Sequence, residues 1–388
     1  MFCRILCFSV SATFLLLLSC GGSDSPAAPD KPEPAYDFVH HQDIATQGGA
    51  DFQSFAIGGE TYLAAANAYS GSSVDIDSRI YKWVDTSFVE FQAIPTSQAS
   101  DWEYFEIGSE SYLAVANLSS GGSTNTDSRI YRWSGTAFIE VQSIPTSGAF
   151  DWEFFEIGAD PYIAVANEHS DYDFTIDSKI FRWNGSSFVE FQSIPTMGAK
   201  DWEFFTVGAD SFLAVANWTD GVTRNVDSRI YRWNGSLFTE YQSIPTVGGR
   251  DWEPFEIGAE AYLAIANFSD GATQDVDSRV YRWNGSSFTA YQSIPTSGAT
   301  GWEYFEIGAV SFLAVANYVS TEANSRNIDS RIYIWDGASF AAHQAVPTHG
   351  AQDWEHFVIG QDHYIACANL FDGSTYQLDS IVLKAVAR

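Results

Sequence analysis

One motif recurs seven times along this chain of 388 residues. It is easily followed through a Trp-Glu pair, which six of the copies contain, at Trp102, Trp152, Trp202, Trp252, Trp302 and Trp354. The first copy has Phe52-Gln53 instead. Neighbouring copies are 50 residues apart, and only the last interval is longer, at 52 residues. Repetition of this length is typical of solenoids, propellers and arrays, so we expect one large repeated body.

Each copy contains four strand-like segments separated by turn signals. The first reads Trp-Glu-x-Phe-x-Ile, and the second, Tyr-Leu-Ala-Val-Ala, is apolar on both faces, which indicates burial from both sides. The third, Arg-Ile-Tyr-Arg-Trp, leads to Asn184-Gly185 or its equivalents, which favour a two-residue type I′ hairpin. The fourth reads Phe-x-x-x-Gln-x-Ile and is followed by a proline such as Pro195, which a sheet interior does not accept. The pattern predicts an all-β fold, a seven-bladed β-propeller with four antiparallel strands per blade.

The two ends of the repeated region indicate how the ring closes. Residues 37–46 align with 87–96, which form a fourth strand, and the last copy ends after its third strand at 380–384. An N-terminal strand is therefore expected to complete the last blade, so that no blade is left one strand short.

The N-terminus predicts a targeting segment. Residues 1–19 read as a lipoprotein signal peptide, because the apolar stretch 8–18 is too short to span a bilayer as a mature helix. The stretch is followed by Ser19-Cys20 and resembles a bacterial lipobox, so Cys20 is the expected lipidation site. The alternative is a plain signal peptide with an incidental cysteine.

Three segments follow from this assignment: the signal peptide 1–19, a disordered Pro-rich tether over 20–36, and the propeller over 37–388. Gly21 follows the cysteine where an Asp would suggest retention in the inner membrane, so we expect a lipid-anchored protein at the outer membrane or cell surface. Cys367 is then the remaining thiol of the propeller, and it stands where other copies have Ala or Val, which predicts a small buried side chain.

Charge excludes one class of partner. The chain has 49 acidic residues against 19 Lys and Arg, a net charge of −30. Such a surface repels phosphate backbones and anionic headgroups, so nucleic acid is not an expected partner, and contact with a membrane is expected only through the lipid anchor.

The repeated segments of the motif resemble those of a known family. Asp-Trp-Glu-x-Phe, Tyr-Leu-Ala-Val-Ala-Asn, Ser-x-Ile-Tyr-x-Trp-Asn-Gly and Phe-x-x-x-Gln-x-Ile-Pro-Thr together resemble the epilepsy-associated repeat, also called the EAR or EPTP repeat, over essentially all of 37–388. The resemblance implies a seven-bladed propeller that binds other proteins outside the cell and has no catalytic activity. The sequence lacks the leucine-rich domain of some family members and begins with a bacterial-type lipobox, so the animal partners do not carry over.

Acidic residues are predicted to gather at one mouth of the central channel. The first strand of each blade begins there, and its Asp and Glu recur in most copies: Asp101, Glu103, Asp151, Glu153, Asp201, Glu203, Asp251, Glu253, Asp353 and Glu355. One interpretation is structural, in which the Asp, Asn and Ser side chains hydrogen-bond the backbone of tight loops. The other is an oxygen-lined site for a hard cation, for which we expect Ca²⁺.

The loops between the second and third strands, here called the variable loops, differ most between copies. They are 68–76, 118–126, 168–176, 218–226, 268–276, 318–328 and 370–378. Six aromatic residues in them are candidate partner-binding anchors, namely Tyr69, Tyr172, Trp218, Phe268, Tyr318 and Phe371. The alternative is that these rings pack on the neighbouring blade.

Six of the seven histidines belong to the last two blades: His40, His41, His343, His349, His356 and His363. Of these, His41 and His343 replace Phe or Tyr of other copies, so aromatic substitution is favoured over metal ligation.

The sequence thus favours a non-enzymatic, monomeric, surface-anchored scaffold that binds an extracellular protein through its variable loops. A carbohydrate-binding propeller is the alternative, and a glycan-active enzyme is the third reading. Catalysis is disfavoured because a catalytic centre needs unlike groups at one place, whereas almost every candidate acid recurs six or seven times.

Overall fold

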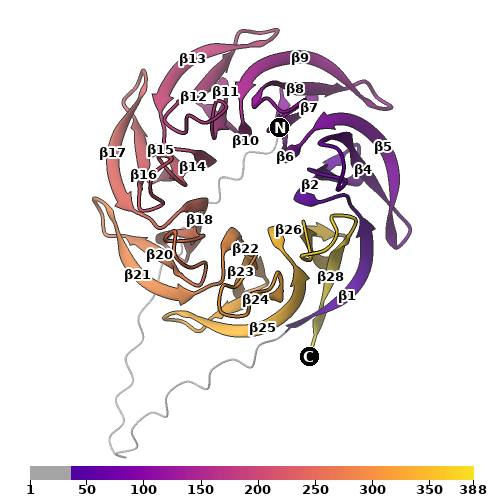
Figure 1. Ribbon diagram of the computed structural model, residues 1–388, viewed down its shortest axis with the longest axis vertical. Helices are drawn as coiled ribbons and strands as arrows, with labels where there is room; N and C mark the ends of the chain where they lie inside the picture. The colour runs from indigo at the N-terminus through magenta and orange to yellow at the C-terminus, as the bar shows by residue number, and fades with distance from the viewer. Residues whose placement is uncertain (1–35) are drawn as a thin grey trace, which may run out of the picture. The chain divides into compact units, whose positions relative to one another are not determined.

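The structure, a computed structural model, describes residues 36–388. Seven four-stranded antiparallel sheets follow one another around a central channel (Figure 1). The predicted all-β, seven-bladed propeller is confirmed. Among residues 36–388, no helix has the length and hydropathy needed to cross a lipid bilayer.

Six blades are continuous in sequence, and their strands run from the channel outward in chain order. The first blade contains β2 (Gly49–Ile57), β3 (Glu60–Asn67), β4 (Asp75–Val84) and β5 (Ser87–Ser97). The second contains β6 (Ala99–Ile107), β7 (Glu110–Asn117), β8 (Asn125–Trp133) and β9 (Phe138–Ser147). The third contains β10 (Ala149–Ile157), β11 (Asp160–Asn167), β12 (Asp177–Trp183) and β13 (Phe188–Pro195).

The fourth blade contains β14 (Ala199–Val207), β15 (Asp210–Asn217), β16 (Asp227–Trp233) and β17 (Phe238–Pro245). The fifth contains β18 (Gly249–Ile257), β19 (Glu260–Asn267), β20 (Asp277–Trp283) and β21 (Phe288–Pro295). The sixth contains β22 (Ala299–Ile307), β23 (Val310–Asn317), β24 (Asn327–Trp335) and β25 (Phe340–His349). The seventh combines β26 (Ala351–Ile359), β27 (Asp362–Asn369) and β28 (Asp379–Ala387) with β1 (Tyr36–Ala45).

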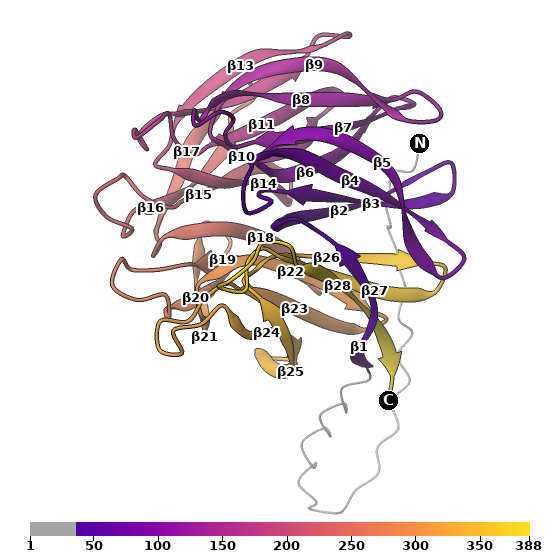
Figure 2. The same cartoon turned by 45° about the vertical axis from the view of Figure 1, so that its right-hand side comes forward.

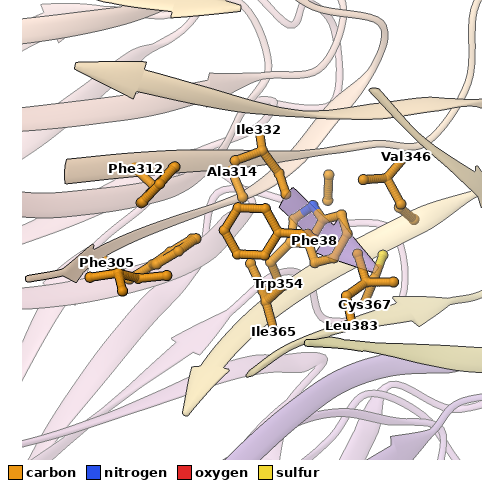
Figure 3. Packing of buried hydrophobic residues seen from close by; sticks show 13 residues of the cluster. Phe38, Phe305, Phe312, Ala314, Ile332, Val346, Trp354, Ile365, Cys367 and Leu383 are labelled. Carbon is orange, nitrogen blue, oxygen red and sulfur yellow. The ribbon is translucent and has the colours of Figure 1, made fainter. Parts of the chain in front are cut away.

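The ring closes as the sequence predicts. The first strand of the described chain, β1, pairs antiparallel with β28 and lies on the outside of the seventh blade (Figures 1 and 2). Its Phe38 ring meets the edges of Phe305 and Phe312 at centroid distances of 5.6 and 5.4 Å. Figure 3 shows Phe38 among side chains of the sixth and seventh blades, including Trp354 and Cys367. Cys367 is fully buried, as predicted.

Hydrophobic cores lie between neighbouring blades. The core between the third and fourth blades contains Phe155 and Ile180 from one blade and Trp202, Leu213 and Val215 from the other. Residues of the second strand are buried on both faces, so they contribute to two successive cores, as their continuous apolar sequence predicts. The repeated tryptophan therefore fills the space between two sheets.

The repeated glutamine of the fourth strand joins the outer strands of neighbouring blades. The Gln192 side-chain amide donates to the Phe238 carbonyl at 2.8 Å, and its oxygen accepts from the Phe238 backbone N–H at 3.0 Å. The same pair of bonds occurs at every blade junction, and at the closing junction Gln344 bonds Phe38 of β1. The N-terminal strand is thus held to the sixth blade as well as to β28.

One local prediction is wrong. The Asn-Gly turns are not two-residue type I′ hairpins, because β12 ends at Trp183 and β13 begins at Phe188. The Asn184 side-chain oxygen accepts from the backbone N–H groups of Ser186 and Ser187, and only Gly185 of the pair has a positive φ, at +100°. The asparagine side chain therefore closes a longer loop in place of the second left-handed residue that a type I′ turn requires.

His41 and His343 occupy aromatic positions of the repeat, as predicted, and His356 does so as well. His41 stacks on Trp83 at 5.5 Å, and His356 stacks on Phe305 at 4.6 Å, like Phe154 on Phe105 in the second and third blades. His356 and His363 also share a hydrogen bond of 3.1 Å.

Candidate functional site

Two rings of acids line the central channel. The aspartate ring contains Asp51, Asp101, Asp151, Asp201, Asp251 and Asp353, and the glutamate ring contains Glu103, Glu153, Glu203, Glu253, Glu303 and Glu355. Gly301 and Gln53 occupy the two remaining positions. The rings surround a cavity of about 170 Å³, and a second cavity of about 100 Å³ lies at the mouth above the aspartates. All ten acids that the sequence predicts for this mouth line the channel.

Each aspartate joins one inner strand to the next. Asp151 on β10 accepts a hydrogen bond of 2.9 Å from the backbone N–H of Trp202 on β14, in the following blade. Equivalent bonds connect five other junctions, and Gly301 leaves the seventh, between the sixth and seventh blades, without one. The structural interpretation of these acids therefore needs a correction, because they bond the neighbouring strand and not a tight loop.

The glutamates repeat this pattern two residues further along the strand. Glu153 accepts from the Phe204 backbone N–H at 2.9 Å, and Gln53 accepts from Tyr104 at 2.8 Å in the same way. Glu203 departs from the pattern, because the equivalent residue of the next blade is Pro254, which has no N–H. Among the glutamates of the ring, Glu203 is the one whose carboxylate receives no such bond from the next blade.

Burial makes these carboxyl groups hard to ionise. It raises the pKa of Asp151 to about 7 and that of Glu355 to about 8, against the hydrogen bonds that they accept. For Asp101 and Glu103, burial and then the repulsion of neighbouring carboxylates raise the pKa well above the usual range. The rings therefore carry fewer negative charges at neutral pH than their composition suggests.

The carboxylates of the rings are of the ligand type that calcium prefers. Most of them accept a single backbone hydrogen bond, which leaves further oxygen lone pairs directed at the channel. However, in residues 36–388 no three His, Cys, Asp or Glu side chains converge closely enough to form a metal-binding group. Calcium binding in the channel stays a prediction.

The bases of the variable loops are held by a polar network that every blade repeats. In the second blade, the Asn117 amide donates to the Asp127 carbonyl at 2.9 Å, and its oxygen accepts from the Ser97 backbone N–H. The Ser128 hydroxyl accepts from the Asn117 backbone N–H and bonds the Thr146 hydroxyl. Loop fixation by Asn and Ser, one part of the structural interpretation, is therefore correct.

The six candidate aromatic residues lie in the variable loops, but most of them are packed. Tyr172 is 94% exposed, whereas Phe268 is 7% exposed and contradicts the expectation of an exposed ring. The guanidinium of Arg250 lies 4.5 Å from the centre of the Phe268 ring, which explains the burial. The other four rings are half-buried, and Tyr69 and Phe371 both pack on Tyr376.

Sequence reasoning missed a second exposed apolar residue. Val222, at the tip of the variable loop of the fourth blade, is 92% exposed. The other exposed large apolar residues among 36–388 are only about half as exposed, at 43–47%, and Val189 on the outer strand β13 is an example. Tyr172 and Val222 therefore stand out, and they belong to adjacent blades.

The position before each ring aspartate was also missed. Its seven occupants are all different, namely Ala50, Ser100, Phe150, Lys200, Arg250, Thr300 and Gln352, and all of them line the mouth cavity. The signal was visible in the sequence, because this variable position lies next to one that is Asp in six of the seven copies. Lys200 is nearly buried and pairs with the buried Glu168 of a variable loop at 2.6 Å.

Comparison with known proteins supports the fold and the family. The crystal structure of the Cps50 (Swd1) β-propeller domain from Myceliophteria thermophila is similar, with a TM-score of 0.57 and 10% identity over 89% of this chain and 99% of that one. This likeness concerns the fold alone. Proteins of mouse and human described as thrombospondin-type laminin G domain and EAR repeat-containing protein are each 41% identical over 61 residues. That match spans 15% of this chain and 9% of each relative.

The EPTP domain matches seven segments of the chain: 37–84, 87–134, 137–184, 187–234, 237–284, 287–336 and 339–384. Each matched segment begins with the outer strand of one blade and continues through the first three strands of the next, as 37–84 does with β1 to β4. The repeat of the sequence is thus offset by one strand from the blade of the structure. Because these segments cover most of the chain, the protein belongs to the EPTP-domain family.

Proposed function

We propose that this protein is a non-enzymatic binding scaffold, anchored at the outer membrane or cell surface through Cys20, that engages an extracellular protein through its variable loops. Membership of the EPTP family and the propeller fold are consistent with a protein-interaction role. Cys20 and residues 20–35 of the predicted tether lie outside the described residues, whereas Tyr36 already belongs to β1, so the anchor rests on the lipobox-like sequence.

The exposure of Tyr172 and Val222 carries this proposal. Both side chains are more than nine-tenths exposed, and they lie at the tips of variable loops in the third and fourth blades. When a partner covers apolar side chains that are exposed to water at loop tips, the free energy of the system falls, which favours binding. Rigid blades underneath fix the loop bases, which lowers the entropic cost of binding.

The channel acids support a non-catalytic role. The ring aspartates, and most of the glutamates, already bond the backbone of the next blade, and these bonds recur around the channel. A glycan hydrolase needs two unlike carboxyl environments at one place, whereas these side chains perform one structural task many times over.

A carbohydrate-binding function is the second candidate, and one observation favours it. Equivalent clefts lie at two blade junctions, one lined by Thr46, Arg79 and Tyr81, the other by the corresponding Thr296, Arg331 and Tyr333. The second cleft is larger, at about 740 Å³ against about 260 Å³, and has Ala342 where the first has Glu90. Binding of the full chain to a glycan array, and its loss on Arg331→Ala substitution, would favour this candidate.

Affinity capture with matched variants tests the protein-binding proposal. The immobilised full chain is exposed to an extracellular protein fraction, and captured proteins are identified by mass spectrometry. The double variant Y172S/V222S should lose a partner that the wild-type chain retains. The control V141S/V189S removes two half-exposed valines from the outer strands β9 and β13, and should retain that partner. Equal capture by both double variants would refute binding through the loop tips.

A further inference from the structure

Most basic residues of the propeller belong to its repeated framework. One series on the third strand bonds a glutamate of the fourth in four blades, as in Arg229–Glu240 at 2.9 Å, whereas its members Arg279 and Arg331 have Ala290 and Ala342 at the glutamate position. A second series pairs with the acid that begins the second strand, as in Arg182–Asp160 at 2.8 Å. Leaving aside Arg388 at the end of the chain, the basic residues among 36–388 that belong to neither series are Lys200, Arg224, Arg250 and Arg326. All four lie at the channel mouth or in a variable loop.

Three of these cations surround the rings of Trp218 and Phe268, and Lys200 also lies 3.7 Å from the centre of the Phe150 ring of the third blade. Lys200, Arg224 and Arg250 lie 4.9, 4.9 and 5.4 Å from the centre of the Trp218 ring. Arg224 and Arg250 also lie 5.8 and 4.5 Å from the centre of Phe268. We call the three cations and the rings of Trp218 and Phe268 the basic–aromatic cluster. Its members come from the fourth and fifth blades. Arg326 lies in the same way over the Tyr318 and Phe371 rings of the sixth and seventh blades, but the mouth positions there are Thr300 and Gln352 and add no second cation.

The charge of the cluster is only partly neutralised. Glu168 pairs with Lys200, and burial lowers the pKa of Lys200 to about 7 in spite of that pairing. Arg224 and Arg250 form no ion pair with any residue of the described chain. The nearby loop carboxylates of Asp220 and Asp270 each accept two backbone N–H groups of their own loops instead.

Two hydrogen-bond donors in the cluster also lack an acceptor. The Nε atom of Arg250 and the Nε1 atom of Trp218 are both inaccessible to solvent, and neither has a hydrogen-bond partner within residues 36–388. A buried donor without an acceptor costs about 1–3 kcal/mol, so such groups are usually satisfied. Framework tryptophans such as Trp102 and Trp354 also lack an acceptor, so the free donors do not single out the cluster. It is the two unpaired guanidinium groups that point to a ligand with anionic acceptor oxygens.

We propose that the basic–aromatic cluster binds the side-chain carboxylates of an acidic peptide segment. This assignment rests on the proposed function and specifies the chemistry of the protein partner. Planar guanidinium groups bind carboxylates through two parallel hydrogen bonds, and aromatic stacking holds Arg224 and Arg250 in fixed orientations.

A carboxylate ligand fits the cluster better than a stacked sugar ring. Sugars bind aromatic side chains through the open face of the ring, but cations already lie close to the Trp218 and Phe268 rings. The protein carries a net charge of −30, so a uniformly acidic partner is repelled at long range. A short acidic segment that reaches the cluster meets local positive charge, which favours selective docking.

Fluorescence anisotropy tests this assignment with the full chain and three labelled probes: a capped oligoglutamate peptide, an oligoglutamine peptide of equal length and an oligogalacturonate. The wild-type chain should bind oligoglutamate at least about tenfold more tightly than oligoglutamine, and added salt should weaken this binding. The double variant R224Q/R250Q should lose about tenfold or more in affinity. The single variant R224Q, at a half-buried loop position, should show a smaller loss and guards against misfolding of the double variant.

The matched control is R229Q/R279Q, which removes the same charge from the repeated third-strand series and should leave affinity within about twofold. An equal loss in this control, equal affinity for oligoglutamate and oligoglutamine, or stronger binding of oligogalacturonate would each overturn the assignment.

The scaffold proposal and the acidic-peptide assignment can be refuted independently of each other. If Y172S/V222S loses partner capture while R224Q/R250Q keeps oligoglutamate affinity, the acidic-peptide assignment is wrong and the scaffold proposal stands. If R224Q/R250Q loses oligoglutamate affinity while Y172S/V222S captures normally, the cluster stands and docking through the loop tips is wrong.

Discussion

The wall and the mouth of the central channel are built from neighbouring positions of the same strands, and they behave differently. The wall position is Asp in six of seven blades, and each of these side chains bonds the next blade. The preceding position, at the mouth, holds a different residue in every blade. Residues that join neighbouring blades make the same bond in each blade and are therefore alike. Residues at the mouth make no such repeated bond, so they can differ between blades and can provide a binding surface for a partner.

Two tryptophans give the largest expected contrast between the regions. Trp202 is fully buried in the framework and donates to the Val165 carbonyl at 3.1 Å, whereas Trp218 is half-buried at the mouth. Trp202→Ala should lower the free energy of unfolding by about 3–5 kcal/mol, and Trp218→Ala by less than about 2 kcal/mol. Guanidinium denaturation followed by circular dichroism measures both. Equal losses would mean that Trp218 contributes as much to the stability of the fold as the buried framework does.

The pH dependence of stability should have opposite signs in the two regions. Burial raises the pKa of Asp151 from 3.8 to about 7, so the folded state keeps a proton that the unfolded chain has released. Stability should therefore fall as pH rises from about 4 to 8, and the melting temperature in chelator should be several degrees lower at pH 8 than at pH 5. Asp151→Asn should flatten this slope.

Lys200 should act in the reverse sense at higher pH. Burial lowers its pKa from 10.5 to about 7, so between these values the unfolded chain binds the extra proton and stability should rise with pH. Lys200→Gln should remove this rise and leave the slope between about pH 5 and 7 unchanged, while below pH 5 the slope changes because Glu168 loses the partner that lowers its pKa. A change between about pH 5 and 7 would show that Lys200 acts on the aspartate ring.

Calcium should sharpen the contrast because its predicted site is the acid-lined wall. Added Ca²⁺ should raise the melting temperature at pH 8 by a few degrees and much less at pH 5, where the carboxyl groups are protonated. Glu203→Gln should reduce the gain, since Glu203 receives no backbone bond from the next blade. R224Q should leave the gain intact. Absence of bound calcium by metal analysis, with no thermal shift, would exclude the channel site.

The smallest expected effect concerns the missing bond of the glutamate ring. Pro254→Ala restores an N–H opposite Glu203, which should add a hydrogen bond but also free the unfolded chain. The net change in unfolding free energy should be about 1 kcal/mol or less. A variant with Glu203→Gln in addition separates the two contributions in a double-mutant cycle. A loss of several kcal/mol would mean that Pro254 has a packing role of its own.

The sequence predicted the fold because its signals are local and repeated. The period corresponds to one blade, and the apolar second strand is buried on both faces. The segment 37–46, which aligns with 87–96, forms the outer strand that pairs with β28. The bonding of the acids was not predictable from one repeat, because Asp151 meets Trp202 only when two blades are placed side by side. The predicted type I′ turn at Asn184 was wrong because the Asn184 side chain bonds the backbone of the loop and so favours a different turn geometry.

The candidate site was harder to predict, because exposure depends on neighbours far along the chain. Phe268 is an ordinary loop aromatic in sequence, and only the structure places Arg224 and Arg250 against it. Lys200 and Arg250 lie within the conserved part of the repeat and not in a variable loop, so the comparison of the loops did not predict them as site residues. In repeat proteins, the position where the copies disagree most, next to one where they agree, is the better guide to a binding site.

Closure by β1 and β28 has a consequence for biosynthesis. The strand made first is the one that completes the blade made last, so β1 emerges from the ribosome long before its partner exists. At roughly 5–20 residues per second, synthesis of β28 follows that of β1 by about twenty seconds to a minute. A chain that is truncated before β28 would keep an unsealed ring, so the ring can close only when the whole repeated region is present.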